Sequence, residues 1–162
     1  MQKVMPDQAW VLKRELLWIP FFGWGLKVLE PIAIDRKAGR KAGDQVVRQG
    51  VELLAKGRWI VVFPEGTRVP PGERKKFGVG GVLLAKKAGA AILPIAHNAG
   101  CYWPKHGFVR RPGVIKMVIG EPISTKGTPM KVVNQQAKDW IDAKTTELEQ
   151  QAFGQESGQE SR

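Results

Sequence analysis

The sequence predicts an α/β protein with a single domain, in which helices flank a mostly parallel sheet. Two apolar runs of strand length, 59–63 and 91–97, alternate with helical patterns at 41–56 and 79–88. Strands and helices that alternate along a chain are typical of right-handed βαβ units around a parallel sheet. Both runs are almost continuously apolar, as in strands covered on both faces. The length of 162 residues suits one domain.

The remaining elements follow from local patterns. Residues 28–35 alternate as a strand does, and 41–56 repeats apolar side chains at helical spacing. Gly57 stands directly after that helix, where a terminating glycine belongs, and Gly89 closes the 79–88 helix in the same way. The order of strand, helix, strand, helix and strand is therefore complete by residue 97.

The carboxy-terminal part adds a more exposed strand at 114–119 and a longer helix. Thr128 and Pro129 form a helix start, with proline at the first helical position behind a capping threonine. The apolar face expected for this helix comprises Val133, Ala137, Trp140, Ile141 and Leu148. The last residues are a short polar repeat with nothing to bury, so we expect a domain over 1–152 and a disordered tail over 153–162.

Charge is the unusual feature of the composition. Lys and Arg total 26 against 15 Asp and Glu, a formal net charge of +11. Such a surface favours nucleic acid, acidic lipid headgroups or small phosphorylated substrates. One cysteine, Cys101, and two histidines, His97 and His106, predict neither a disulfide nor a metal site. We interpret Cys101 as a buried small side chain, His97 as packed or hydrogen-bonded, and His106 as solvated.

An aromatic segment near the amino terminus admits two interpretations. The apolar stretch 16–26 is too short to span a bilayer and is interrupted by Pro20. Its aromatic residues lie among basic ones, which is typical of a membrane interface. The aromatic residues are Trp18, Phe21, Phe22 and Trp24, and the basic ones are Lys13, Arg14 and Lys27. The stretch by itself favours core packing.

The hexapeptide Phe-Pro-Glu-Gly-Thr-Arg at 63–68 is the most informative motif. It follows a predicted buried parallel strand, where open α/β sheets place ligands. Gly66 permits close approach of the backbone, and Arg68 offers a planar fork that matches phosphate oxygens. Glu65 is a natural partner for that guanidinium, so a plain loop salt bridge is an equal alternative to a ligand site.

Four segments in order resemble the lysophosphatidic acid (1-acyl-sn-glycerol-3-phosphate) acyltransferases. Residues 63–68 resemble the family's Glu-Gly-Thr-Arg block. Residues 13–23 resemble a family segment in which a basic residue is followed by Glu-Leu, Pro and Gly. Residues 34–36 resemble the family's second block, which ends in arginine. Residues 93–96, with a central proline, resemble its fourth block. The resemblance runs from about residue 10 to residue 122 and implies a glycerol-3-phosphate acyltransferase-like fold.

The resemblance implies transfer of an acyl group from acyl-CoA or acyl carrier protein to the hydroxyl of a lysophospholipid, without a bound cofactor. Arg36 and Arg68 would bind the glycerol phosphate, and Glu65 would orient Arg68. The residues that it assigns to substrate binding are Lys13, Arg36, Glu65, Gly66, Thr67 and Arg68, with Pro94 shaping the pocket wall. The aromatic segment would contact the cytoplasmic face of the membrane peripherally.

The family's base is the histidine of a His-x-x-x-x-Asp motif. Tyr102 stands five residues after His97, and Arg111 stands five residues after His106, so the 162 residues do not contain that motif. Loss of a general base costs on the order of 10²–10⁴ in rate. We therefore expect an N-terminally incomplete domain, a fragment or a misassigned start, that binds its ligand and does not turn over by itself.

Two other functions stay open at this point. A non-catalytic module that binds anionic lipid or the membrane surface would need the same aromatic and basic residues. A basic nucleic-acid-binding protein would explain the net charge, but the sequence contains no helix-turn-helix, zinc-finger spacing or aromatic ribonucleoprotein motif. We expect no nucleic-acid partner.

Overall fold

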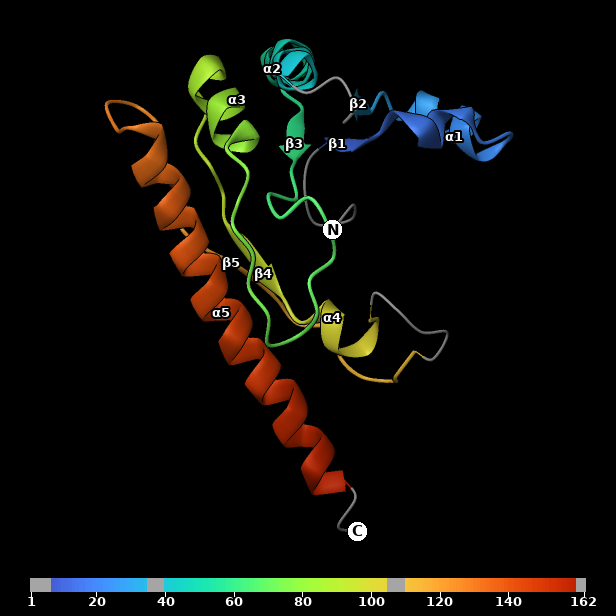
Figure 1. The fold of residues 1–162 in the computed structure, drawn as a ribbon, viewed down its shortest axis with the longest axis vertical. Coiled ribbons are helices and arrows are strands. Elements are labelled where there is room, and N and C mark those ends of the chain that lie inside the picture. Colours follow the sequence, from blue (N-terminus) through green and yellow to red (C-terminus); the bar gives the residue numbers. More distant parts are fainter. Residues whose placement is uncertain (1–6, 35–39, 105–109, 160–162) are drawn as a thin grey trace. The chain divides into compact units, whose positions relative to one another are not determined.

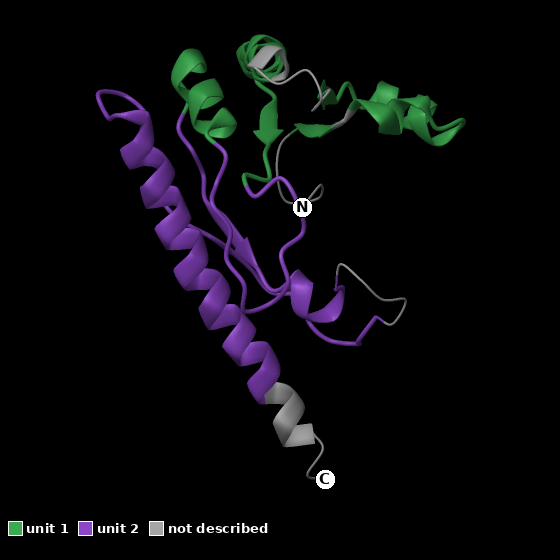
Figure 2. Ribbon diagram, in the orientation of Figure 1, with its two compact units in different colours: residues 1–64, 79–90 green, residues 65–78, 91–162 purple. Residues whose placement is uncertain are grey.

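The computed structural model describes residues 7–34, 40–104 and 110–159. The chain divides into two compact units, which Figure 2 shows in different colours. Unit 1 comprises residues 1–64 and 79–90, and unit 2 comprises residues 65–78 and 91–162. The boundary passes through the hexapeptide motif, between Pro64 and Glu65.

Unit 1 contains a three-stranded parallel sheet (Figure 1). Strand β1 (Gln8–Lys13) lies in the middle, between β2 (Ile32–Ile34) and β3 (Trp59–Val61). Val11 is opposite Ile32, and Gln8 is opposite Trp59. The predicted parallel sheet with flanking helices is confirmed. The central strand was not predicted, because its apolar run of Ala9 to Leu12 is only four residues long, and periodicity cannot distinguish so short a run from a buried helical segment.

Two helices of unit 1 pack on each other and were both predicted. They are α2 (Arg40–Ala55) and α3 (Gly80–Ala88). The absence of a side chain at Gly50 permits this contact, because a Cβ there would come within 2.6 Å of the buried side chain of Leu84. Gly57 and Gly89 adopt φ angles of 78° and 64°, the left-handed conformation expected of helix-terminating glycines.

The strand β3 is more exposed than the sequence suggested. Trp59 is 40% exposed and Phe63 is 53% exposed, so the prediction of a strand covered on both faces is wrong. Within the described residues β3 pairs with β1 alone and ends at Val61, which leaves Phe63 beyond the sheet. The Phe63 ring lies against Trp10, with 5.9 Å between ring centroids.

A basic residue ties the ends of several unit 1 elements together. Arg58 donates to the carboxylate of Glu30 at 2.9 Å and to the backbone oxygens of Gln8 and Leu29 at 3.0 and 3.1 Å. It thus joins the start of β1 to the chain that follows the aromatic segment. That segment forms a 3₁₀ helix, η1 (Arg14–Trp18), and a short helix, α1 (Phe22–Val28). The strand expected at 28–35 is therefore shorter, because Val28 belongs to α1.

Unit 2 places a two-stranded antiparallel sheet beside a long helix. Strand β4 (Ile95–His97) pairs with β5 (Met117–Ile119), and α4 (Ala99–Tyr102) follows β4 directly. Helix α5 (Met130–Gln159) packs along β4. The sequence suggested that the 91–97 strand would join the parallel sheet. It pairs instead with β5, which a chain reversal brings back in the opposite direction.

The buried face of α5 fixes its contact with the rest of unit 2. Val133, Ala137 and Leu148, all predicted for this face, are buried. Ala152 is buried in a cluster with Cys101 and Tyr102, so packing continues to the border of the expected polar tail. The helix itself extends through Gln159, beyond the start of that tail at Phe153. Within the described ranges no helix has both the length and the apolar composition needed to cross a bilayer.

Candidate functional site

The loop 65–78, which carries most of the hexapeptide motif, lies in unit 2. Gly66 has a φ of 67°, so the turn after Glu65 uses the left-handed conformation that glycine adopts at little cost. A second turn follows, in which the N–H of Glu73 donates to the oxygen of Pro70 at 3.1 Å. Gly72 has a φ of 82° in this turn, which is the geometry of a type II turn with Pro at its second position. Two tight turns therefore define the path of the loop.

A buried carboxylate of α5 holds the middle of this loop. Glu149 accepts from the backbone N–H of Gly72 at 3.2 Å and from Nη2 of Arg74 at 2.8 Å. Arg74 also donates to the hydroxyl of Thr146 at 2.6 Å and lies 4.0 Å from a carboxylate oxygen of Asp142. Hydrogen bonds between charged groups are the stronger kind, so the Glu149 contacts fix the loop firmly on the helix.

The end of the loop is attached to α5 through an aromatic residue. The Phe77 side chain is buried, and its backbone oxygen accepts from the amide of Asn134 at 3.5 Å. The ammonium of Lys138 lies 5.7 Å from the centroid of the Phe77 ring and pairs with Asp142. Contacts to α5 thus occur at both the middle and the end of the loop.

Glu65 lies among charges of both signs. Partial burial raises the pKa of its carboxyl, and the negative charge of Asp142 raises that pKa further. The positive charges of Arg74, Lys138 and Lys75 act in the opposite direction without reversing the shift. Three of these charged groups, Asp142, Arg74 and Lys138, also take part in the contacts between the loop and α5. Among the described residues no hydrogen bond or ion pair joins Glu65 to Arg68, and its orienting role stays a prediction.

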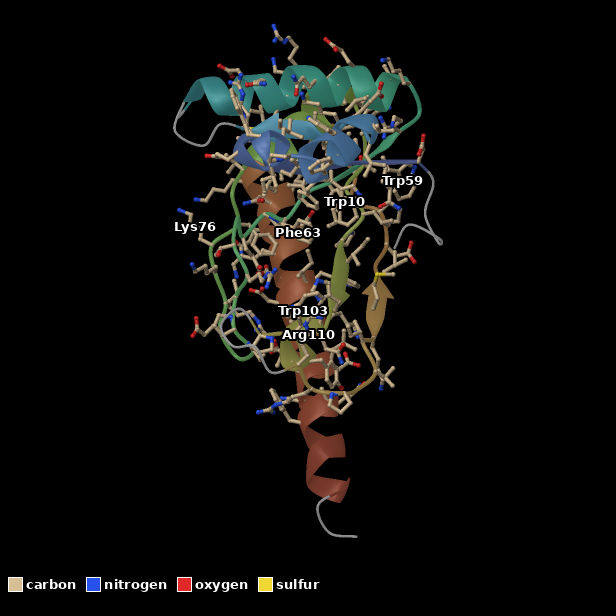
Figure 3. All side chains as sticks on the ribbon, turned by 90° about the vertical axis from the view of Figure 1, so that its right-hand side faces the viewer. Trp10, Trp59, Phe63, Lys76, Trp103 and Arg110 are labelled. Atoms are coloured by element: carbon tan, nitrogen blue, oxygen red, sulfur yellow. The ribbon has the colours of Figure 1, made fainter. Side chains whose placement is uncertain are left out.

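The guanidinium of Arg68 lies beside an aromatic ring. Arg68 is exposed, and its Cζ is 5.9 Å from the ring centroid of Trp103. A second guanidinium, that of Arg110, lies 4.1 Å from the same centroid, and Figure 3 labels Trp103 and Arg110 at adjacent positions. Neither Trp103 nor Arg110 was predicted from the sequence. The only available signal was that they occur in the basic loop 98–112 after the fourth motif.

The aromatic segment of unit 1 is a separate exposed surface. Trp18 and Phe21 are 77% and 80% exposed, and the rings of Phe21 and Trp24 meet edge to face with centroids 5.2 Å apart. Core packing, which the stretch by itself favoured, is therefore wrong. Phe21 has a φ of 61°, an uncommon conformation for a bulky residue. Phe22 is also exposed.

The reactive side chains considered earlier have local explanations. His97 is exposed, and its Nδ1 accepts from the N–H of Ala99 at 3.3 Å, so the hydrogen-bonded role is confirmed. Cys101 is buried, as predicted. His106 lies outside the described residues. None of these observations assigns a base to the site.

Residues 2–98 match the model of the family described as Acyltransferase. The chain belongs to this acyltransferase family. It is 50% identical over 141 residues to the 1-acyl-sn-glycerol-3-phosphate acyltransferase of Pseudomonas aeruginosa, covering 85% of this chain and 55% of that relative. It is 33% identical over 130 residues to 1-acyl-sn-glycerol-3-phosphate acyltransferase alpha of Mus musculus, covering 78% and 46%. The family resemblance inferred from the four motifs is confirmed.

A solved structure agrees with these relatives. The 1-acyl-sn-glycerophosphate (LPA) acyltransferase PlsC of Thermotoga maritima superposes with a TM-score of 0.72 at 29% identity. The match covers 88% of this chain and 57% of that structure. The chain spans about half the length of the curated relatives it matches.

The other residues that the family resemblance assigned to the acyltransferase site lie in both units. Lys13 is the last residue of β1, where its backbone is level with Ile34 of β2. Arg36 lies outside the described residues. Pro94 is buried in unit 2, its oxygen accepts from the N–H of Gly120 at 2.9 Å, and a Cβ on Gly120 would be 3.0 Å from its ring. The substrate-binding and pocket-shaping roles remain predictions.

Proposed function

We propose that this chain is part of a 1-acyl-sn-glycerol-3-phosphate acyltransferase of phospholipid biosynthesis, and that the loop 65–78 binds the phosphate of the acceptor. The donor would be acyl-CoA or acyl carrier protein. The observation that carries the proposal is the difference between the attached part of the loop and Arg68. Its middle and end are tied to α5 through Gly72, Arg74 and Phe77, whereas Arg68 stays exposed.

The free donors of Arg68 support this assignment. A guanidinium has five N–H donors in a planar fork that matches phosphate oxygens. Among the described residues no carboxylate lies within ion-pairing distance of Arg68, and its neighbour Trp103 contributes only a ring face. The donors are therefore available to an external anion. Lysophosphatidate supplies such an anion at the position that the motif predicts.

In the proposed reaction the free hydroxyl oxygen of the acceptor attacks the thioester carbonyl. A carbon–oxygen ester bond forms, the carbon–sulfur bond breaks, and the hydroxyl proton ends on the released thiol. We assign the binding and orientation of the acceptor to Arg68 and the loop 65–78, because holding a reactant in position lowers the entropic part of the barrier. No step is assigned to His97, which is engaged with Ala99.

The test of phosphate binding compares Arg68→Gln and Arg68→Lys with the unchanged chain. The ligand is a short-chain, water-soluble lysophosphatidate, and the matched ligand is the monoacylglycerol without the phosphate. We expect Arg68→Gln to weaken lysophosphatidate binding about tenfold, since a hydrogen bond to a charged group contributes about 1.5–3 kcal/mol. Arg68→Lys should retain part of the affinity. Equal affinity of Arg68→Gln and the unchanged chain would contradict the proposal.

Turnover is tested separately. The 162 residues are expected to bind without transferring the acyl group, because His97 and His106 do not stand in a His-x-x-x-x-Asp motif. The assay supplies acyl-CoA or acyl carrier protein with lysophosphatidate and measures phosphatidate. Robust acylation by the purified 162-residue chain would show that the expectation of inactivity is wrong, while leaving the phosphate-binding assignment intact.

The exposed aromatic segment supports peripheral contact with the membrane that supplies the lipid. Aromatic rings beside basic residues favour the interface between headgroups and acyl chains. Binding to anionic vesicles should therefore depend on Trp18 and Trp24 and not on Arg68. Vesicle binding that persists in Arg68→Gln, together with loss of lysophosphatidate binding, would separate this surface from the phosphate site. Loss of both functions in Arg68→Gln would contradict that separation.

A further inference from the structure

Three exposed side chains of unit 2 converge at the last residue of the hexapeptide motif. Arg68 comes from the loop 65–78, Trp103 follows α4, and Arg110 follows it in the sequence. The two guanidinium carbons lie 5.9 and 4.1 Å from the Trp103 ring centroid. Trp103 is 50% exposed, so one ring serves both arginines and still faces solvent.

The backbone around this ring is well fixed. The N–H of Trp103 donates to the oxygen of Ala99 at 2.9 Å, which ends α4. Its neighbour Tyr102 is buried, and the oxygen of Tyr102 accepts from the N–H of Arg111 at 3.0 Å. Buried Tyr102 thus precedes Trp103 in the chain and also binds the backbone of Arg111, the residue after Arg110.

The charges of this group are unbalanced. An indole face stabilises a guanidinium by roughly 0.5–1 kcal/mol at an exposed site, and it neutralises no charge. Among the described residues neither Arg68 nor Arg110 forms an ion pair with a carboxylate. Two guanidiniums that share one ring repel each other, and an anion that accepts from both would remove that repulsion. The pair of guanidiniums therefore suits an anion with several acceptor oxygens.

We propose that Trp103 and Arg110 complete, together with Arg68, a binding site for a phosphomonoester dianion. Trp103 is the platform that positions both guanidiniums, and Arg110 supplies the second planar fork. A terminal phosphate carries close to two negative charges and three strong acceptor oxygens near neutral pH, which suits two forks better than one. The inference rests on the proposed function, and it adds Trp103 and Arg110 to the residues that recognise the phosphomonoester of the acceptor.

The test uses the full 162-residue chain and isothermal titration calorimetry. The ligands are short-chain lysophosphatidate, its glycerol phosphodiester analogue, the monoacylglycerol, and inorganic phosphate. The variants are Arg110→Gln, Arg110→Lys, Trp103→Ala, Trp103→Phe and Arg68→Gln. Lys131→Gln is the matched control, because Lys131 is an exposed cation in the first turn of α5, at the end of unit 2 away from α4 (Figure 1).

We expect Arg110→Gln to weaken lysophosphatidate binding about tenfold and to reduce the preference for the monoester over the diester. Trp103→Ala should weaken it as well, and Trp103→Phe should restore part of the loss, since a smaller aromatic face remains. Arg110→Lys should fall between Arg110→Gln and the unchanged chain, because lysine lacks the planar fork. Lys131→Gln should stay within about twofold of the unchanged chain, as an exposed charge away from the site contributes little. Far-UV circular dichroism checks that each variant is folded.

The outcomes separate this inference from the proposed function. Weaker binding in Arg68→Gln with unchanged binding in Arg110→Gln and Trp103→Ala would overturn the inference and leave the proposed function standing. Weaker binding in Arg110→Gln with unchanged binding in Arg68→Gln would overturn the phosphate-binding role of Arg68, and with it both the proposed function of the loop and the shared site. Failure of the unchanged chain to bind any phosphorylated ligand would overturn both. Comparable, Arg110-dependent binding of inorganic phosphate would support the shared chemistry and identify free phosphate as a sufficient ligand.

Discussion

The loop 65–78 of unit 2 and the aromatic segment 18–24 of unit 1 are stabilised in opposite ways. The loop depends on side chains that are distant in sequence: Glu149 binds Gly72 and Arg74 across more than seventy residues. The aromatic segment depends on its own backbone, with the N–H of Gly23 donating to the oxygen of Ile19 at 2.7 Å. A group that must position a phosphate requires a fixed loop, whereas an apolar surface requires only that its rings stay exposed.

We expect the largest loss of stability when the attachment of the loop to α5 is removed. Glu149→Ala leaves the N–H of Gly72 and the guanidinium of Arg74 without their shared acceptor. Because Arg74 is partly exposed, we expect a loss of about 2 kcal/mol in the free energy of unfolding, measured by urea denaturation. Glu147→Gln, in an exposed ion pair with Lys144 on the same helix, should change it by no more than about 0.5 kcal/mol. Equal losses in both variants would refute the special role of Glu149.

The next largest effect is expected from a substitution that disturbs the backbone of the aromatic segment. A Cβ at Gly23 would lie 2.3 Å from the backbone oxygen of Leu17, so Gly23→Ala forces the turn apart. We expect a loss of roughly 1–2 kcal/mol in the free energy of unfolding and faster amide hydrogen exchange in α1. Gly25→Ala is the control, since a Cβ there meets nothing within 4 Å and alanine favours the helix. Similar exchange rates in the two variants would contradict this account.

A smaller effect is expected when exposed rings of the aromatic segment are removed without a change of fold. Trp18→Ser combined with Trp24→Ser should weaken partition onto anionic vesicles about tenfold, because both indoles prefer the interface. The urea midpoint should hardly move, as both side chains are exposed in the free chain. Ile115→Ser, which removes an exposed apolar residue of unit 2, should leave partition unchanged. A loss in that control would show that vesicle binding follows exposed apolar area in general.

The smallest effect concerns the charge of Glu65. Its raised pKa means that the folded chain holds this proton more tightly than the unfolded chain does, so ionisation costs stability as the pH rises from 4.5 through the raised pKa. Glu65→Gln should therefore stabilise the chain at pH 7 by less than about 1 kcal/mol. The gain should disappear below pH 4.5, where Glu65 is protonated in both states. A gain that is the same at pH 4 and pH 7 would contradict the shift.

The helices and the motif were predictable because their signals are local. Residues 41–56 and 79–88 show helical spacing followed by glycine, and both helices are present with left-handed glycines at their ends. The hexapeptide pointed to the loop and to Arg68, whose substrate-binding role stays a prediction. The central strand β1 was missed, because its burial comes from neighbours on both sides and its own residues carry no periodic pattern.

The sequence alone determined the family, the α/β class and the basic loop, since each depends on residues that lie close together along the chain. The tertiary structure decided which side chains contact that loop. Glu149 holds Arg74, and Trp103 gathers Arg68 with Arg110, although no spacing rule connects these residues. It also decided that the aromatic segment is exposed and not buried. The physical reason is that burial and charge pairing depend on distances in space. Local sequence patterns do not give these distances for segments that are far apart along the chain.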